Sequence, residues 1–446
     1  MFEFPKGLYV DLRVEDIHST NIAYVLGEIS QYTLRAYRAA FVRVFDGDRW
    51  YCKGLTDAEH LQATIDELAG LATPDTKIEK HPVIRALEVN QGEFRAFADE
   101  DLALVPMEEK NALIKGYIGA IAARPAVKSW TAKYLDRREI KHFISSLGAD
   151  LIFDTQRCGA ALQGQMAAEG DKTHFDLFSR AAVRFPELHG LENDIRSTFD
   201  RAEHFLENSC AVEPGTYPVI LSPMAAGVFA HECFGHKSEA DFMIGDESAA
   251  TEWAIGKRIG AEILSIVDDG GVDGSGHVPF DDEGTRARRT DLIRNGVLAG
   301  RLHSAVTAAA LGESVTGNSR AVGFSYEPIP RMTMTSIGPG ELDKEELFSR
   351  VDDGIYVETI KHGSGMSTFT LAPNRAYRVV GGKIADPVKI SVVTGEVFAA
   401  LGDVVGLSDK VELQSFVGGG CGKMEQMNLP VGFGGPYVLV RSLDVR

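Results

Sequence analysis

The sequence predicts an α+β protein in two parts: an α/β N-terminal domain of mixed strands and helices, residues 1–213, and a β-rich, antiparallel C-terminal domain, residues 214–446. A chain of 446 residues with 44% hydrophobic content is long enough to build two cores. Strand and helix patterns alternate in the first half, whereas short strand patterns and glycine dominate the second. The Pro and Gly residues of AVEPGTYP separate the halves, because they cannot continue a helix.

The elements of the first half follow from hydrophobic periodicity. Alternating apolar residues in GLYVDLRVED (7–16) and RAAFVRVFDG (38–47) predict half-buried strands. A helix is expected next, because Thr56 and Glu59 have the spacing of a capping box and apolar residues then recur at helical intervals. The same reasoning predicts, in chain order, a helix from Pro106, strands within 138–154 and 158–170, and a helix over roughly 190–208.

The second half opens with an apolar segment and the motif HECFGHKSEAD (231–241), which we expect on a helix near the start of the C-terminal domain. Helical periodicity is weak after it, so an antiparallel β-rich arrangement is expected. Short apolar alternations predict strands at 261–269, 354–360, 367–372, 376–380, 389–395 and 437–443.

Charge and composition exclude several classes of protein. The 46 Lys and Arg residues against 64 Asp and Glu give a net charge of −18, which repels nucleic acid and anionic membrane surfaces. No basic run offsets this charge. The first residues lack the pattern of a signal peptide, and nowhere do 18 apolar residues run together. We therefore expect a cytoplasmic protein without nucleic-acid or membrane partners.

Cysteine usage agrees with a reducing compartment. The five cysteines are odd in number and form no CxxC pair, which favours free thiols over a disulfide framework. Cys52, Cys158, Cys210 and Cys233 are expected to be small buried residues. Cys421 differs from them because it lies among glycines that let the backbone approach a site closely.

The motif HECFGHKSEAD raises the question of a metal site. It differs from the metalloprotease signature HExxH by one extra residue between Glu232 and His236. In an ideal α-helix, residues five apart point about 140° away from each other, whereas HExxH histidines are about 40° apart. A π turn would bring His231 and His236 to one side, and Gly235 would ease that distortion.

Two interpretations of the motif remain open on spacing alone. Two histidines and a glutamate can match by chance on a solvated helix face. The apolar segment PVILSPMAAGVFA before His231 favours a buried site, where a neutral ring needs a partner. Glu239 and Asp241 are either surface acids or carboxylates that could orient the imidazoles. Cys421 is either a third ligand or merely a small residue in a glycine-rich turn.

Four segments resemble the TldD/PmbA family, specifically its catalytic TldD-type members. HECFGHKSEAD resembles the family's HExxxHxxExD, and CGKMEQMNLPVGFGGP (421–436) resembles its closing CGKxGQxxPVGxGxP. The stretches 267–304, which contains DDEGT, and 316–341, which contains PRM and PG, resemble two further family segments in the right order. The resemblance covers residues from about 215 to the C-terminus, while the first half fits only in its order of strands and helices.

The resemblance implies a zinc peptidase. Its zinc ligands would be His231, His236 and Cys421, and Glu232 would be the general acid/base. It also implies an α/β domain followed by a β-rich domain, peptide or unfolded small-protein substrates, and a homodimer or a heterodimer with a PmbA-type subunit.

The chain departs from the family pattern in places that leave the ligands intact. The family's first helix is absent or very short, Met424 and Glu425 stand where glycine is common, and Gly435 replaces a common Gln. These departures affect substrate preference and the closing loop. The sequence assigns no substrate-binding residue.

Other interpretations accompany the zinc peptidase. His277 and His362 are candidates to stabilise an oxyanion, or they are structural. The chain could instead be a non-catalytic peptide-binding or dimer-partner subunit, although such subunits lack the ligand residues. Cys233, inside the motif, would also suit a redox-sensitive switch, although a small buried residue is the simpler account.

Overall fold

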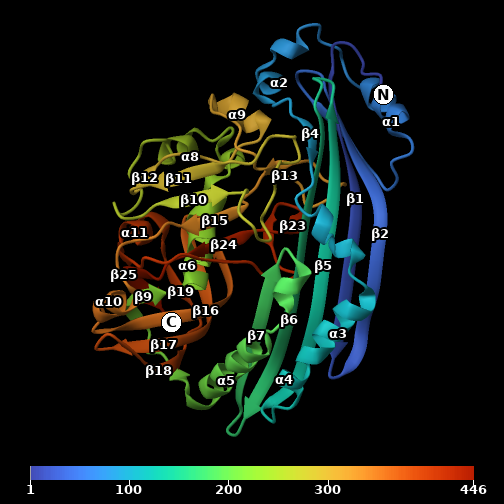
Figure 1. The fold of residues 1–446 in the computed structure, drawn as a ribbon. Coiled ribbons are helices and arrows are strands. Elements are labelled where there is room, and N and C mark those ends of the chain that lie inside the picture. The colour runs from blue at the N-terminus through green and yellow to red at the C-terminus, as the bar shows by residue number, and fades with distance from the viewer. Residues whose placement is uncertain (1) are drawn as a thin grey trace.

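A computed structural model describes residues 2–446 and has an α+β fold with two halves, as the sequence predicts. Figure 1 shows the two halves side by side, with the long strands of the first half forming one flank of the molecule. Among the described residues, no helix is both long enough and apolar enough to span a bilayer.

The first half is built on one seven-stranded sheet. Its strands are β1 (Tyr9–Val25), β2 (Glu28–Phe45), β3 (Trp50–Leu55), β4 (Gln91–Phe94), β5 (Val127–Ser145), β6 (Asp150–Ala168) and β7 (Lys172–Ala182). The order is β3-β2-β1-β5-β6-β4, with β7 also paired to β6. β1, β2, β5 and β6 run antiparallel, and Leu12 of β1 lies opposite both Val42 and Ile144. The alternation seen in the sequence puts Leu12 and Val42 on a buried face. The prediction of half-buried strands is wrong for this part of β1 and β2, because the alternating polar residues Asp11, Arg13 and Arg43 are also buried, in ion pairs.

Helices cover part of this sheet. They are α1 (Leu61–Ala69), α2 (Pro82–Ala86), α3 (Met107–Tyr117), α4 (Gly119–Ala122) and α5 (Glu192–Asn208), with 3₁₀ turns η1 (Ile78–Lys80), η2 (Ala98–Glu100), η3 (Leu102–Leu104) and η4 (Phe185–Leu188). The helices predicted from Pro106 and over 190–208 are present. The predicted capping box is wrong: α1 begins at Leu61, after His60, and no side chain caps it. Its start is set by Leu61 and Ile65, which pack with apolar residues of β1 and β2.

The second half contains two larger sheets. Its strands are β8 (Cys210–Ala211), β9 (Gly215–Leu221), β10 (Ile266–Asp269), β11 (Arg289–Arg294), β12 (Val297–Leu298), β13 (Ser319–Arg320), β14 (Ile329–Pro330), β15 (Met334–Ile337), β16 (Asp353–Gly365), β17 (Thr368–Val380), β18 (Lys383–Lys389), β19 (Val393–Glu396), β20 (Val404–Leu407), β21 (Glu412–Gln414), β22 (Cys421–Lys423), β23 (Gln426–Leu429), β24 (Gly432–Gly435) and β25 (Val438–Val445).

Most of these strands pair antiparallel, as predicted, while β9–β16, β15–β24 and β8–β18 are parallel pairs. One sheet has the order β12-β11-β10-β15-β24-β21. In the other, β16, β9, β25, β19 and β17 follow one another, and pairing of β16 with β17 closes them into a ring. Because a closed ring leaves few free edges, this sheet is a stable frame for the elements packed on it.

Helices of the second half are α6 (Pro223–Ala230), α7 (His236–Ser238), α8 (Glu247–Glu252), α9 (Ala305–Leu311), α10 (Lys344–Ser349) and α11 (Val397–Gly402), with a π turn η5 (His231–Gly235) and a 3₁₀ turn η6 (Ala240–Met243). α6 contacts β16 of the ring and also β15 and β24 of the other sheet. This central helix leads directly into the HECFGHKSEAD motif.

Buried ion pairs join the two halves. The Arg43 guanidinium on β2 lies 3.1 Å from the Glu283 carboxylate, and the Lys141 ammonium on β5 lies 2.6 Å from the Asp282 carboxylate. Asp282 and Glu283 belong to the DDEGT segment. The buried Asp282 carboxylate would be costly without its partners, and the charges of Arg13 and Lys141 hold its pKa below the usual value against the opposing effect of burial.

Two of the four predicted buried cysteines are in fact exposed. Cys158 and Cys233 are buried, as expected, but Cys52 and Cys210 are exposed. Cys52 lies on β3 and Cys210 on β8, and each of these strands is the last in its sheet. An edge strand leaves one side of the chain to solvent, which a short sequence pattern does not reveal.

Gly227 of α6 provides a stability test, because a Cβ there would lie 2.5 Å from the backbone nitrogen of Gly434 on β24. We expect Gly227→Ala to lower the free energy of unfolding by about 1–3 kcal/mol, since two backbones must separate. Gly116→Ala is the matched control, because a Cβ there meets nothing within 4 Å and α3 gains helix propensity. Urea unfolding followed by circular dichroism measures both; equal stability of the two variants would contradict the close packing of α6.

Candidate metal centre

The helix that carries the motif is anchored at its start. Ser222 precedes α6 and its hydroxyl accepts a hydrogen bond from the Ala225 amide at 3.1 Å, while Pro223 occupies the first turn. Residues from Ala225 to Ala230 are buried between the ring and the neighbouring sheet. The chain therefore arrives at His231 inside the protein, where a polar ring needs a partner.

The motif adopts the π turn that its spacing requires. Residues His231–Gly235 form a π-helical turn, and α7 continues from His236. Gly235 has an ordinary helical φ of −54°, so conformational freedom is not its role. A Cβ at Gly235 would instead lie 2.1 Å from the sulfur of Met332, so the glycine makes room for that side chain. The wide turn brings the ring centroids of His231 and His236 to 5.0 Å.

Cys421 joins the two histidines from the far end of the chain. It is the first residue of β22 in a short hairpin with β23, and it is buried. The ligand atoms of His231, His236 and Cys421 all lie within 4.8 Å of one another. The Cys421 sulfur is 3.4 Å from His236 Nε2. All three residues singled out in the sequence as candidate ligands thus meet in one place.

These residues have the chemistry of a metal site. Burial opposes ionisation of the Cys421 thiol, but the charge of His231 and hydrogen bonds to both histidines outweigh it and lower its pKa to about 5. Among residues 2–446, the buried Nδ1 of His231 has no hydrogen-bond partner. Two imidazoles and a thiolate form a donor set typical of zinc, and a cation between them would compensate these groups. The three residues therefore fit a zinc ion.

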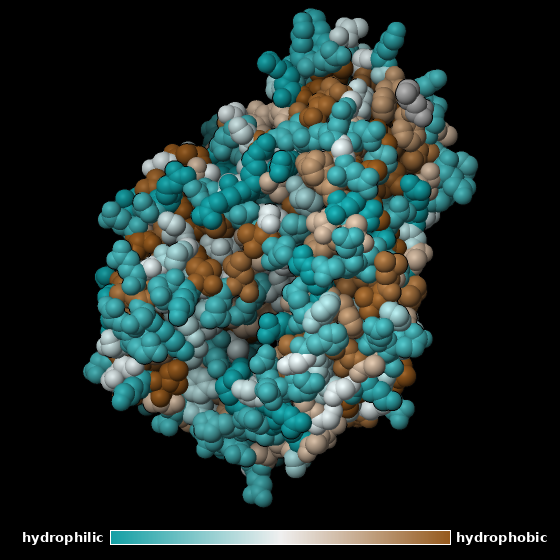
Figure 2. Space-filling view, viewed as in Figure 1, coloured by the Kyte–Doolittle hydropathy of each residue, from teal (hydrophilic) through white to brown (hydrophobic). Residues whose placement is uncertain are grey.

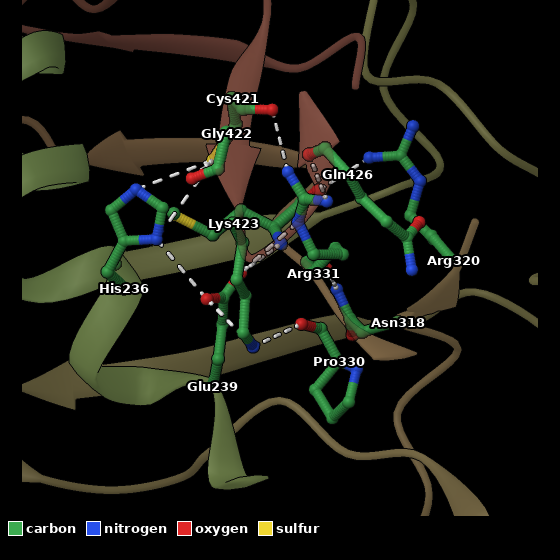
Figure 3. Close-up of polar contacts among 12 residues, drawn as sticks. His236, Glu239, Asn318, Arg320, Pro330, Arg331, Cys421, Gly422, Lys423 and Gln426 are labelled. Atoms are coloured by element: carbon green, nitrogen blue, oxygen red, sulfur yellow. Dashed lines mark hydrogen bonds and ion pairs between the residues drawn. The ribbon is translucent and has the colours of Figure 1, made fainter. Parts of the chain in front are cut away.

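A buried network holds His236 from behind. His236 Nδ1 lies 3.2 Å from a carboxylate oxygen of Glu239, which leaves Nε2 facing Cys421. Figure 3 shows His236 between these two residues. Glu239 is fully buried; burial alone would raise the pKa of this carboxyl, but the hydrogen bond from His236 and the charge of Lys423 hold it below its usual value. Glu239 therefore remains ionised beside the imidazole.

The sequence suggested that Asp241 could orient an imidazole directly, but its carboxylate contacts a lysine instead. Its carboxylate lies 2.7 Å from the Lys423 ammonium, which also contacts Glu239 at 3.2 Å and the Pro330 carbonyl at 2.9 Å. Asp241 therefore acts on His236 only through Lys423 and Glu239. Arg331 completes the network by donating to the Cys421 carbonyl at 2.7 Å.

Sequence reasoning did not single out Lys423 and Arg331, although both lie in segments that it quoted, CGKMEQ and PRM. A buried carboxylate such as that of Glu239 needs a cation, and a lysine two residues after a candidate ligand was the available signal. The hydrogen bond from Arg331 fixes the backbone at Cys421.

Glu232 lines a cavity of about 610 Å³ together with the three candidate ligands. Strand β16 passes beside it: a Cβ at Gly363 would lie 2.7 Å from Glu232 Cγ, and one at Gly365 would lie 2.4 Å from its carbonyl oxygen. His362 lines the same cavity. His277 does not, because it packs edge-on against Phe97 of the first half, with ring centroids 6.0 Å apart. Half of the other lining residues are apolar, namely Val228, Phe242, Ile360, Met366, Phe416, Met424, Met427, Val431 and Phe433.

The fold and the site define an α+β protein with a buried His–His–Cys group suited to a metal ion. The model of the "PmbA/TldA metallopeptidase C-terminal domain" matches residues 214–446, and that of "PmbA/TldA metallopeptidase domain 1" matches residues 10–72. The chain belongs to the PmbA/TldD family of metallopeptidases.

Curated relatives of this chain are named metalloproteases. A metalloprotease of Synechocystis is 29% identical over 98% of this chain and 94% of its own length. A metalloprotease of Methanothermobacter thermautotrophicus is 33% identical over 76% and 74%. A zinc metalloprotease TldD homolog of Saccharolobus solfataricus is 31% identical over 72% of both chains.

Solved structures share the fold at low identity. A Thermotoga maritima protein described as a candidate modulator of a DNA gyrase has 21% identity, a TM-score of 0.78 and coverage of 99% of this chain and 96% of that one. TldE from Thermococcus kodakarensis has 18% identity, a TM-score of 0.75 and coverage of 98% and 96%.

The Lys423 network provides a test of the site's stability. We expect Lys423→Met to lower the free energy of unfolding by about 3–5 kcal/mol, because Glu239 and Asp241 lose the cation that both contact. The matched control is Lys361→Met, at an exposed position on the cavity wall, which should leave stability almost unchanged. Urea unfolding in the presence of a chelator isolates the effect from metal binding. Similar stability of the two variants would show that the buried ion pairs contribute little.

Proposed function

We propose that this chain is a zinc-dependent peptidase that hydrolyses peptide bonds in unfolded or extended peptides. His231, His236 and Cys421 hold the zinc ion, and Glu232 is the general acid/base. The observation that carries the proposal is the meeting of the three donor groups within 4.8 Å in a cavity that Glu232 also lines. The metalloprotease names of the curated relatives support the same activity.

In the proposed hydrolysis, the metal would act as a Lewis acid and Glu232 would transfer the protons. A zinc ion held by His231, His236 and Cys421 would supply Lewis acidity, which would polarise the peptide carbonyl and make a water more acidic near neutral pH. The Glu232 carboxylate takes a proton from the attacking water and delivers it to the leaving amine. Gly363 and Gly365 let β16 lie against Glu232, so its side chain is held at the cavity wall. Glu239 orients His236 so that Nε2 faces the position of the metal.

An extended peptide suits the cavity better than a folded protein does. β16 pairs with β9 only over Ile355–Val357, so among the described residues its later part is paired on one side, with β17. A peptide can add to such a free edge through main-chain hydrogen bonds, which requires an unfolded segment. We infer that His362 stabilises the oxyanion, a role that its place in the lining of the same cavity supports.

The family resemblance supports the assembly, and the lack of a signal-peptide pattern in the sequence supports the location. The peptidase works in the cytoplasm as a homodimer or with a PmbA-type subunit. A net charge of −18 disfavours nucleic acid and anionic membranes as partners.

Replacement of Glu232 separates catalysis from metal binding. Glu232→Gln should lower kcat for cleavage of a mixed peptide library by at least about 100-fold, because the amide cannot accept the proton. Zinc content, measured by elemental analysis, should stay at one per chain. The matched variant Cys421→Ser should lose zinc as well as activity. Cleavage retained by Glu232→Gln would overturn the assignment, and a wild type that neither binds zinc nor cleaves any peptide would favour a non-catalytic subunit.

Replacement of Glu239 tests its orienting role. We expect Glu239→Gln to weaken zinc binding by about 10–100-fold, because His236 Nδ1 loses its charged partner. Asp241→Asn is the control, since it removes a carboxylate from the same lysine without touching the imidazole. Its zinc affinity should fall by less than about tenfold. Competition with a chromogenic chelator measures the zinc affinity of both variants. If both lose affinity equally, the charge of the network explains the effect, and Glu239 has no special role in orienting His236.

A further inference from the structure

A second cavity adjoins the one at the metal centre. It also has a volume of about 610 Å³, and Ile360 and Phe416 line both cavities. One wall comes from β7 and α5 of the first half, and the other from β16, β17 and β21 of the second half. Figure 2 shows the surface hollowed between the two halves. No part of the mechanism above uses this cavity.

The two cavities differ in chemistry. Apolar side chains dominate the first, whereas hydrogen-bonding and charged groups from both halves line the second, among them Arg180, Ser197, Arg201, Thr359, Arg375 and Gln414. Such a wall suits the backbone and polar side chains of a peptide.

Asn374 adds an unsatisfied group to this wall. Its side chain is only 9% exposed, and its nitrogen donates to Asp176 Oδ1 at 3.1 Å. Within residues 2–446, its buried Oδ1 has no hydrogen-bond partner. A buried acceptor without a donor is unfavourable, so the protein itself leaves this part of the cavity wall unsatisfied.

Strand β16 connects the two cavities. Thr359 lines the second cavity, and Gly363, which packs against Glu232, lines the first. These residues are four positions apart, which corresponds to about 13 Å along a strand. A peptide extended along β16 would therefore cover the distance with about four residues of its own.

We propose that the second cavity is a remote substrate subsite, which binds a polar segment of an extended peptide about four residues from the bond that is cut. The proposal rests on the peptidase function and adds a substrate class: peptides long enough to occupy both cavities, apolar near the cut bond and polar beyond it.

Ser197 offers a way to block the second cavity alone. It is exposed on α5 and lines the second cavity but not the first, so Ser197→Trp should fill the space without disturbing the core. His204→Trp is the matched control, because His204 is exposed on the same helix and lines neither cavity. Both variants should unfold at the same temperature as the wild type.

The experiment compares a short quenched fluorescent peptide with versions lengthened by several Ser and Gln residues at either end. For zinc-loaded wild type, one lengthened peptide should have a kcat/KM about tenfold higher than the short one. Ser197→Trp should abolish this gain and keep the kcat/KM of the short peptide within about twofold, while His204→Trp should keep the gain. No gain in the wild type, or a gain that survives Ser197→Trp, would overturn the subsite.

A binding measurement distinguishes failure of the subsite from failure of the peptidase function. Fluorescence anisotropy with Glu232→Gln should give a dissociation constant for the lengthened peptide about tenfold below that of the short one. Adding Ser197→Trp should make the two equal. If the wild type cuts no peptide but this difference in binding is present, the peptidase function fails and the subsite stands. Equal binding of both peptides would refute the subsite whether or not cleavage occurs.

Discussion

The metal centre depends on one backbone feature, the π turn over His231–Gly235. In a regular α-helix, His231 and His236 would point about 140° apart, and no third residue could bring them onto one ion. The widened turn gives up regular hydrogen bonding, so the surrounding structure has to hold it in place. The Ser222 cap fixes one end of the helical segment, and close packing of Gly235 against Met332 fixes the other. The turn is thus stabilised by its position between two sheets.

The buried charges behind the turn serve the same purpose. Lys423 belongs to the hairpin that carries Cys421, while Glu239 and Asp241 belong to the segment that carries His236. Their ion pairs therefore connect the two pieces of chain that carry the candidate ligands, although 182 positions separate Asp241 from Lys423. An apolar contact would allow these pieces to slide, whereas charge-assisted hydrogen bonds favour one register.

Local patterns in the sequence predicted part of this arrangement. Hydrophobic alternation located β1, although the first part of this strand is buried on both faces, and helical periodicity located α5, which buries one face. The five-residue spacing of the histidines required a π turn if they were to share a metal. The failures have tertiary causes: apolar packing rather than Thr56 determines where α1 begins, and edge strands expose Cys52.

The remainder of the site could not be derived from spacing. Cys421 was expected beside the histidines because of the family resemblance, and the partnership of Lys423 with Glu239 depends on how β22 packs against α7. Long-range pairings of this kind are decided by the fold as a whole, so a single sequence contains no local signal for them.

Buried ion pairs also hold the two halves of the molecule together, and this has a consequence for the substrate. Arg43 with Glu283, and Arg375 with Asp176, join the two halves through groups with almost no access to water. Pairs of this kind are strongly destabilised when one partner is removed, so the halves resist movement relative to each other. The second cavity, with walls from both halves, consequently keeps a fixed distance from Glu232. A peptide that reaches from one cavity to the other is then selected by its length and extended shape rather than by closure of the protein around it.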